Sequence, residues 1–547
     1  MRAGVASSDD ARAERTTRLS AVGARSSIYP ALIIGLTAAA LVLRLLFLGS
    51  KSFWVDEGAT ADIVTASWPR LTGLITTSCS AMSLYYVILR VWTSIAGTSE
   101  FALRFPSAIF STLTIPALYL VGAELFDRET GALAAAMMTV NLTAIGYAQE
   151  ARSYALLVLL VTVSAWFFVR ALRRPSLGNC AGYVIFGALG VYAHLFAILV
   201  LPAEWISLWL FKPGRRTTIR LTASAIIFGL LALPNFAVAI AHGNVTRWIL
   251  PTKPKAVLRF FVIESGHLGI NLAGHPRLYD VHLAAGMLLT LLYAAGIIAA
   301  LGFAIRGGRY QSELGFVALC AFVPVAATIL VSTARPFFVN RYLVECFPFI
   351  VMLAAAGIML AGEVVPKRAV FAAVGAILVV GLFDDCLYYR CPGWENWRGA
   401  VSYVARREQP GDAMIIYRGD ARWGVDYYRD RLRDPVKFPA IVYPDWDAVF
   451  RVGGHFIDDR IFDKADPYFE QAVAAPHRRV WLVLRETWTP TLGNAQAARA
   501  TMEQLARRYG PPKVKKFSGV EVVLFASPRQ PAQGPTKQRA SASHWRG

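Results

Sequence analysis

Long apolar runs constrain this chain more than any other feature. About eleven of them are long enough to cross roughly 30 Å of hydrocarbon. In lipid a segment must hydrogen-bond its own backbone, so we expect each run to be a helix. Hydrophobic residues make up 55% of the 547 positions and charged residues 17%, which is typical of a polytopic α-helical membrane protein. The runs cover approximately residues 30–48, 101–123, 131–147, 153–170, 180–193, 195–211, 219–240, 281–305, 312–332, 341–361 and 368–388.

The interval from Gly182 to Phe211 allows two interpretations, either two short helices bent near His194 or one long tilted helix. Loop charge favours two helices, because Lys and Arg then fall in alternate loops, as the positive-inside rule requires. This assignment predicts a multi-pass protein of the plasma membrane with a cytoplasmic N-terminus. Outer loops are then expected at 49–100 and 241–280, and everything after about residue 388 is extracytoplasmic.

The chain changes character after the transmembrane domain, which we place at 29–390. From 391 to 528 the apolar runs shorten to strand length, with strands expected at 413–417, 480–484 and 520–525 and helices at 397–407 and 494–509. A soluble α/β domain with a structural or acceptor-binding role is therefore predicted. Residues 1–28 and 529–547 are polar and rich in small residues, so we expect a disordered cytoplasmic tail and a second disordered tail.

The formal net charge of +20 suggests an anionic partner. Much of this charge lies in loops beside apolar runs, which favours membrane lipids over nucleic acid. The six cysteines show no metal-binding spacing, although Cys386 and Cys391 are close enough in the chain for a local disulfide.

Two carboxylates follow the first apolar run directly, in the stretch Phe53-Trp54-Val55-Asp56-Glu57. A solvated loop start or helix cap would explain them without function. A second polar segment on the same predicted face, Tyr147 to Tyr154, adds Glu150, Arg152 and two phenols between two membrane helices. If these helix ends converge, Asp56 can take a proton from an acceptor hydroxyl while Arg152 neutralises a phosphate leaving group. That chemistry is glycosyl transfer from a lipid phosphate.

The order of these motifs resembles the integral-membrane glycosyltransferases of the GT-C fold. The similarity is to the superfamily of dolichyl-phosphate-mannose protein mannosyltransferases and lipid A aminoarabinose transferases. It is carried by the Asp56-Glu57 motif, Leu84-Tyr85-Tyr86, Leu103 to Ser107, Tyr147 to Leu156, Arg341-Tyr342-Leu343 and Glu395 to Gly399.

The resemblance implies roles for individual residues. Asp56 would be the catalytic base, and Glu57 would support it or hold an acceptor. Glu150 and Arg152, with Tyr154 beside them, would line the sugar-phosphate site. Arg341, followed by Tyr342, would contact the donor phosphate, because a guanidinium offers paired donors and stays charged near lipid. A snorkelling side chain is the alternative for Arg341.

Other positions leave alternatives open. Many relatives carry His or Asp before the Leu-Tyr-Tyr motif, whereas Cys79 to Ser83 precede it here, so a divalent metal is possible but unsupported and no cofactor is required. His194 could bind metal or substrate, or be an interior hydrogen-bonded histidine. The 241–280 loop, with Lys255 and Arg259 as phosphate contacts, is expected to be a mobile donor-binding flap or a solvated loop touching lipid.

The predicted reaction is a single displacement with inversion, from a polyprenyl-phosphate sugar to a glycan, glycolipid or protein acceptor. Mannose is the first choice of sugar and arabinose the second. A lipid-linked sugar flippase should place ionisable residues near mid-membrane, whereas here they gather at helix ends. A non-catalytic envelope scaffold would have no use for Asp56 and Glu150 on one face.

Overall fold

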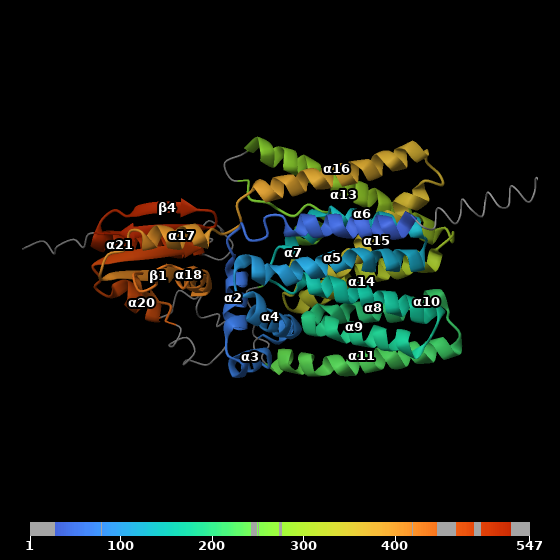
Figure 1. Ribbon diagram of the computed structural model, residues 1–547, viewed down its shortest axis with the longest axis horizontal. Coiled ribbons are helices and arrows are strands. Elements are labelled where there is room, and N and C mark those ends of the chain that lie inside the picture. The colour runs from blue at the N-terminus through green and yellow to red at the C-terminus, as the bar shows by residue number, and fades with distance from the viewer. Residues whose placement is uncertain are drawn as a thin grey trace, which may run out of the picture. The chain divides into compact units, whose positions relative to one another are not determined.

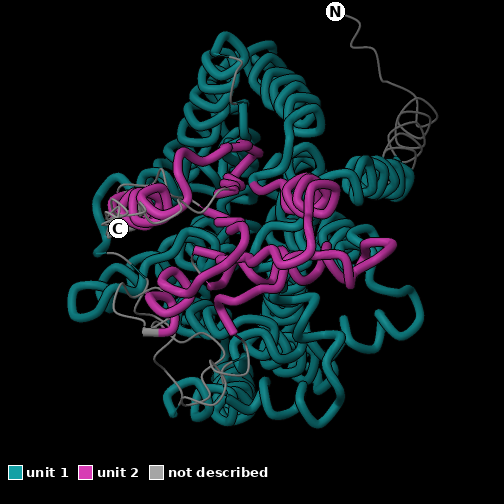
Figure 2. The backbone as a smooth tube through the Cα atoms, turned by 90° about the vertical axis from the view of Figure 1, so that its left-hand side faces the viewer, with its two compact units in different colours: residues 1–394 teal, residues 395–547 magenta. Residues whose placement is uncertain are grey.

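The computed structural model describes residues 28–77, 79–241, 249, 251–272, 276–417, 419–445, 467–485 and 494–526. The two predicted disordered tails lie outside these residues, except for residue 28. The chain forms two compact units, Met1–Trp394 and Glu395–Gly547 (Figure 2).

The first unit is helical, and long helices run side by side in it (Figure 1). Eight helices of the described residues are long and apolar enough to cross a membrane, so this is a multi-pass membrane protein. Its orientation stays a prediction. The eight are Ile28–Leu45, α5 (Glu100–Leu125), α8 (Tyr154–Arg173), α11 (Arg215–Ala241), α13 (Pro276–Ile305), α14 (Gln311–Ala334), the span Val344–Ala361 that contains α15 (Phe347–Ala361), and α16 (Lys367–Arg390).

The remaining predicted segments are broken or short. Residues 131–147 correspond to α6 (Arg128–Thr139) and α7 (Leu142–Ala148), bent by 60° at Asn141, whose side chain caps α7 by accepting the Thr143 and Ala144 N–H groups. The split at His194 is confirmed. Here α9 (Leu177–Ala193) ends, and extended backbone leads into η2 (Leu195–Leu199) and α10 (Val200–Phe211).

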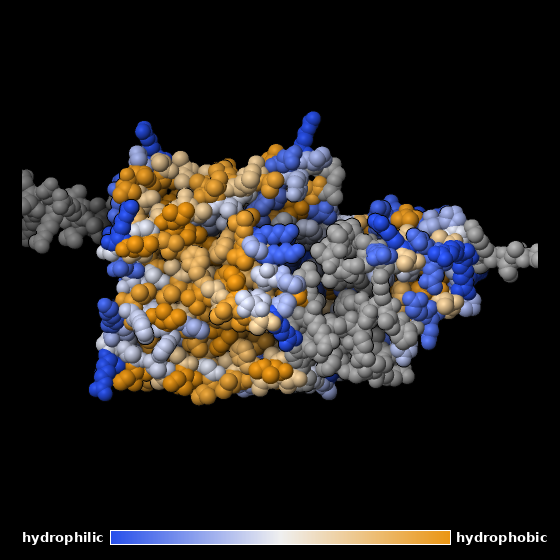
Figure 3. Space-filling model, turned by 180° about the vertical axis from the view of Figure 1, so that it is seen from behind, coloured by the Kyte–Doolittle hydropathy of each residue, from blue (hydrophilic) through white to orange (hydrophobic). Residues whose placement is uncertain are grey.

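The face of the helical unit in Figure 3 is predominantly hydrophobic, with hydrophilic side chains towards its ends. Large apolar side chains are exposed along the helices, among them Trp209, Leu230 and Phe371. Such a surface suits contact with lipid rather than water. Cys386 and Cys391 are thiols and form no disulfide.

Much of the predicted loop 49–100 is helical instead. It forms α2 (Val55–Thr65), α3 (Trp68–Ile75), η1 (Ser80–Met82) and α4 (Ser83–Ala96), and Figure 1 shows α2 crossing the ends of the long helices. These helices are too short or too polar to read as separate membrane spans from hydropathy alone. Residues 241–280 likewise contain α12 (Pro254–Glu264), and parts of the predicted flap, residues 242–248, 250 and 273–275, lie outside the described residues.

Arg341 was expected at the start of a membrane helix. It lies instead in the turn η3 (Asn340–Tyr342), which is followed by a second turn, η4 (Val344–Cys346), before α15 begins at Phe347. Pro348 sits at the start of α15, where its fixed φ favours helix initiation and its missing N–H costs nothing.

The second unit is the predicted α/β domain, with the sheet order β2-β1-β3-β5-β4. Strand β1 pairs in parallel with β2 and β3, and β5 pairs antiparallel with β3 and β4. The elements are α17 (Trp397–Ala405), β1 (Asp412–Tyr417), η5 (Gly419–Ala421), α18 (Arg422–Arg429), β2 (Ala440–Tyr443), α20 (Pro467–Ala474), β3 (Arg479–Arg485), α21 (Asn494–Tyr509), β4 (Lys513–Phe517) and β5 (Val520–Phe525).

The Glu395 to Gly399 motif has a local structural use in this unit. Asn396 caps α17 by accepting the Gly399 N–H at 2.8 Å, and Glu395 accepts the indole N–H of the fully buried Trp397 at 2.7 Å. The three predicted strands and both predicted helices are present, whereas β2, β4, α18 and α20 were not foreseen.

Candidate active site

The two adjacent carboxylates occupy the first turn of α2. Glu57 accepts the backbone N–H of Trp54 at 3.4 Å, which closes the helix start, and both acidic groups lie at the positive end of the helix dipole. Because consecutive residues of a helix point about 100° apart, Asp56 and Glu57 meet different partners.

Glu57 is fully buried and paired with Arg104 of α5. The Arg104 Nε and Nη2 atoms donate to its two oxygens at 2.7 Å each, and the Ala151 N–H donates to Oε1 at 2.9 Å. One carboxylate therefore joins α2, α5 and the link between α7 and α8. Arg104 also donates hydrogen bonds to the backbone carbonyl oxygens of Leu48, Lys51 and Ser52. With these donors already engaged, the geometry favours the supporting role of Glu57 over acceptor binding.

Asp56 faces two guanidinium groups. Its Oδ2 atom lies 3.4 Å from Nη2 of Arg341 and 3.8 Å from Nη2 of Arg152, and its side chain is 26% exposed. Arg152 also donates to the Thr60 hydroxyl at 3.3 Å, and Arg341 lies 5.3 Å from the Trp54 ring centroid. The structure thus brings three predicted residues from distant parts of the chain together around one accessible carboxylate.

The Leu84-Tyr85-Tyr86 motif lies against this group. The Tyr86 hydroxyl is 3.5 Å from Nη1 of Arg152, and the Tyr85 hydroxyl hydrogen-bonds Ser107 at 3.0 Å. Ser107 in turn donates to the Arg152 carbonyl at 3.2 Å. Both phenols are buried. Tyr86 of α4 therefore positions the Arg152 side chain directly, and Tyr85 positions the Arg152 backbone through Ser107 of α5.

His194 is an interior residue whose ring packs among aromatic neighbours. The centroids of Tyr342 and Tyr154 are 5.1 and 6.1 Å away, and Nδ1 accepts the Phe196 N–H at 3.4 Å. His194 lies in the turn between two helices. Burial, with the charges of Arg152 and Arg341, lowers the pKa of His194 to about 3 and keeps the imidazole neutral. The surroundings favour the interior-histidine interpretation.

Glu150 and Tyr154 complete the second polar segment. Burial and the neighbouring charge of Glu57 raise the pKa of Glu150 to about 8, against the opposing effect of Arg341. Glu150 is therefore mostly a neutral acid at pH 7. The Tyr154 ring lies 5.9 Å from the Arg152 guanidinium, and its buried hydroxyl has no hydrogen-bond partner among the described residues.

A pocket opens beside Glu57 and Glu150. Its remaining walls come from five parts of the chain: Lys51, Ser52 and Trp54; Arg104; Gly146 and Gln149; Leu268, Gly269, Ile270 and Asn271; and Tyr388, Cys391, Pro392, Gly393 and Trp394. The Lys51 ammonium donates to the Tyr388 carbonyl at 2.8 Å, and burial lowers the pKa of Lys51 to about 7.

Sequence reasoning missed Lys51 and gave Arg104 no role. A signal was available for both, since Lys51 follows the first apolar run and Arg104 interrupts the second. Lys255 and Arg259 are exposed on α12, and no contact in the described part of the chain joins either to Asp56. Their predicted role in phosphate binding stays a prediction.

The comparisons with known proteins begin with a family model described as dolichyl-phosphate-mannose-protein mannosyltransferase, which matches residues 82–242. No curated protein matches the chain. The chain is similar to the archaeal oligosaccharyltransferase AglB from Archaeoglobus fulgidus, solved with an inhibitory peptide and a dolichol-phosphate. The TM-score is 0.51 at 12% identity, over 93% of this chain and 75% of AglB.

A further similarity is to ArnT from Cupriavidus metallidurans, solved in the apo state and bound to undecaprenyl phosphate. Each of these structures gives a TM-score of 0.49 at 13% identity, over 91% of this chain and 99% of ArnT. The family match includes Tyr86, Arg104, Glu150, Arg152 and His194. By its helical architecture and the likeness to AglB, the chain has the fold of the GT-C superfamily of membrane glycosyltransferases.

Proposed function

We propose that this protein is a membrane glycosyltransferase that moves a sugar from a polyprenyl-phosphate donor to an extracytoplasmic acceptor. One observation carries the proposal: the Asp56 carboxylate lies 3.4 and 3.8 Å from the guanidinium groups of Arg341 and Arg152. A base and two phosphate-binding cations thus share one site at the ends of apolar helices. The family model's description and the dolichol-phosphate in the AglB structure support a lipid-phosphate donor.

The proposed step is a single displacement. The acceptor hydroxyl oxygen attacks the anomeric carbon, its proton passes to Asp56, and the bond from the anomeric carbon to the phosphate oxygen breaks. The electron pair leaves with the polyprenyl phosphate. Attack from the side opposite the leaving group inverts the anomeric centre, and the step as written needs neither a covalent intermediate nor a cofactor.

Arg152 and Arg341 hold the leaving phosphate in this scheme. Guanidinium groups pair with phosphate oxygens through parallel N–H bonds, and the two non-bridging oxygens of the donor phosphodiester, which share one negative charge, compete with the Asp56 carboxylate for them. Donor binding then weakens the two pairings of Asp56 and leaves its carboxylate available to the acceptor hydroxyl. Tyr86 and Thr60 keep Arg152 in place during this exchange.

Mannose is the first sugar we propose, in accordance with the family model's description, and arabinose is the second. A glycan, a glycolipid and a protein hydroxyl are all suitable acceptors, because the proposed chemistry asks only for a nucleophilic hydroxyl within reach of Asp56. Membrane lipids surround the exposed apolar helices in the same scheme.

Labelled polyprenyl-phosphate mannose and arabinose distinguish these possibilities. Purified full-length protein in liposomes is incubated with each donor and separate glycan, lipid and protein fractions, and the product carrying the label is identified. Asp56→Asn should slow transfer by about 10²–10⁴-fold while donor binding persists. The control is Asp62→Asn on the same helix, where the carboxylate is 41% exposed. Near-normal transfer by Asp56→Asn contradicts the proposal, and movement of intact labelled lipid across the bilayer indicates a transporter.

A further inference from the structure

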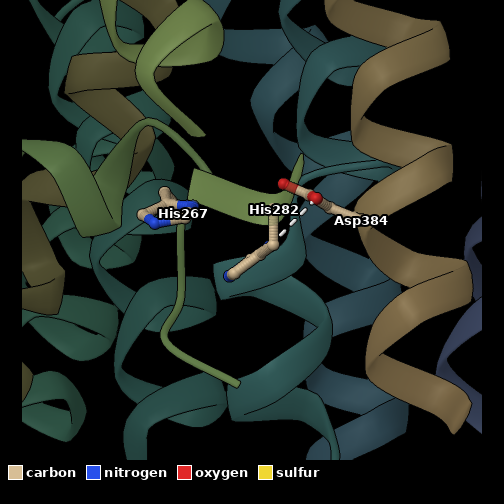
Figure 4. A group of neighbouring side chains, drawn as sticks. All are labelled: His267, His282 and Asp384. Atoms are coloured by element: carbon tan, nitrogen blue, oxygen red, sulfur yellow. Dashed lines mark hydrogen bonds and ion pairs between the residues drawn. The ribbon is translucent and has the colours of Figure 1, made fainter. Parts of the chain in front are cut away.

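Three side chains away from Asp56 meet inside the helical unit. His267 follows α12, His282 lies near the start of α13, and Asp384 lies near the end of α16. Nδ1 of His282 is 3.1 Å from Oδ1 of Asp384, and the two imidazole centroids are 4.3 Å apart. Figure 4 shows the three side chains side by side, with a dashed line joining His282 to Asp384.

Each of the three residues has one buried polar atom without a hydrogen-bond partner among the described residues. His282 is 3% exposed and Asp384 fully buried. Within the described ranges, Nδ1 of His267, Nε2 of His282 and Oδ2 of Asp384 have no partner. Leaving such atoms unpaired costs free energy, and in native proteins such groups often mark a bound ion or water. Orphaned atoms on three buried or partly buried residues whose possible ligand atoms lie close together therefore indicate a ligand.

We propose that His267, His282 and Asp384 bind one divalent transition-metal ion, of which Zn²⁺ is the best fit. Two imidazole nitrogens and one carboxylate oxygen form a donor set that zinc favours, with a fourth position open to water. One ligand atom from each residue lies within 4.8 Å of the others. Bonds of about 2.1 Å place tetrahedral ligands about 3.4 Å apart, so the ligand atoms, which lie within 4.8 Å of one another, must approach by at most roughly 1.4 Å.

Gly286 gives His267 access to this point. It lies one helical turn after His282 on α13, and a Cβ atom there would overlap the imidazole of His267. The charge of Arg259 on α12 acts against a cation near His267, and the Asp384 carboxylate offsets it. The local sequence therefore provides both the space and the negative charge that the ion needs.

The proposed ion also bears on the pocket beside Glu57. His267 immediately precedes Leu268, Gly269, Ile270 and Asn271, which form one wall of that pocket. Coordination would fasten this wall to α13 and α16. Metal binding itself does not depend on the proposed transfer reaction, so the two can fail separately.

Zinc binding to the full-length protein tests the site. Protein purified in detergent without a polyhistidine tag is stripped with a chelator and titrated with Zn²⁺ against a chromophoric competitor. Asp384→Asn should weaken binding by about 10–100-fold or more, whereas Asp385→Asn, a buried neighbour on the same helix, should bind like the wild type. Hydrogen exchange at residues 268–271 should slow when zinc is added to the wild type.

Equal zinc affinity in the Asp384→Asn and Asp385→Asn proteins would overturn the site, as would a wild type that binds no zinc. If Asp384→Asn does not fold, His267→Ala and Gly286→Ala decide the question, because the first removes a ligand and the second fills the space that the His267 imidazole occupies. Wild-type affinity in these two variants rejects the proposed ligand set. Zinc binding without slower exchange at residues 268–271 rejects the fastening of the pocket wall.

Discussion

Glu57→Gln tests whether a buried ion pair positions Asp56. Glu57 is fully buried, its partner Arg104 has a side chain 5% exposed, and two 2.7 Å hydrogen bonds join them. The substitution keeps the shape of the side chain and one acceptor oxygen for the Ala151 N–H. It removes the negative charge that the Arg104 guanidinium faces inside the protein.

The expected loss of stability follows from this geometry. Removing one partner of a buried pair typically costs about 3–5 kcal/mol, and the retained amide oxygen places the cost near the lower end. Asp62→Asn makes the same chemical change on the same helix. Its pair with Arg70 spans 3.6 Å between side chains that are 41% and 48% exposed, so its loss should cost about 0–1 kcal/mol.

Equilibrium unfolding in mixed micelles, followed by tryptophan fluorescence, measures the free energy of unfolding of both variants. Transfer by the folded fraction should fall for Glu57→Gln, because α2 loses the ion pair that holds it to Arg104 of α5. A double variant, Glu57→Leu with Arg104→Met, should regain stability without regaining transfer, since both charges of this buried pair are then removed together. Similar stability losses for Glu57→Gln and Asp62→Asn would refute the reasoning, and an active double variant would refute the positioning role.

Two further predictions concern donor binding. Arg341→Ala should raise the KM for the donor by about 10- to 150-fold, which corresponds to the loss of one charged hydrogen bond. Arg335→Ala, at an exposed position, is the control. Equal KM values in the two variants would contradict the phosphate contact. Because burial raises the pKa of Glu150 to about 8, its carboxyl gains a negative charge as pH rises through 8 and should repel the donor phosphate. The KM for the donor should therefore increase across this range in the wild type. In Glu150→Gln this rise in KM near pH 8 should disappear. If the rise persists in Glu150→Gln, another group is responsible for it.

The membrane helices were predictable because hydrocarbon imposes one solution on any long apolar run. Each predicted run has a helical counterpart, and the break at His194 followed from loop charge. The helices of 49–100 were missed because short segments carry too little periodic signal for hydropathy to separate them from loops. The strands at 413–417, 480–484 and 520–525 were visible as apolar runs, whereas β4, rich in lysine, was not.

The sequence alone placed Asp56 and Arg152 among the candidate residues, because polar groups gather at the ends of apolar runs on one predicted face, and the family resemblance added Arg341. Only the tertiary structure separated the two neighbouring acids, directing Glu57 into a buried pair with Arg104 and Asp56 towards two guanidinium groups. It also brought together His267, which follows α12, His282 of α13 and Asp384 of α16. Such contacts join residues far apart in the chain, and the packing of whole helices decides which of them meet.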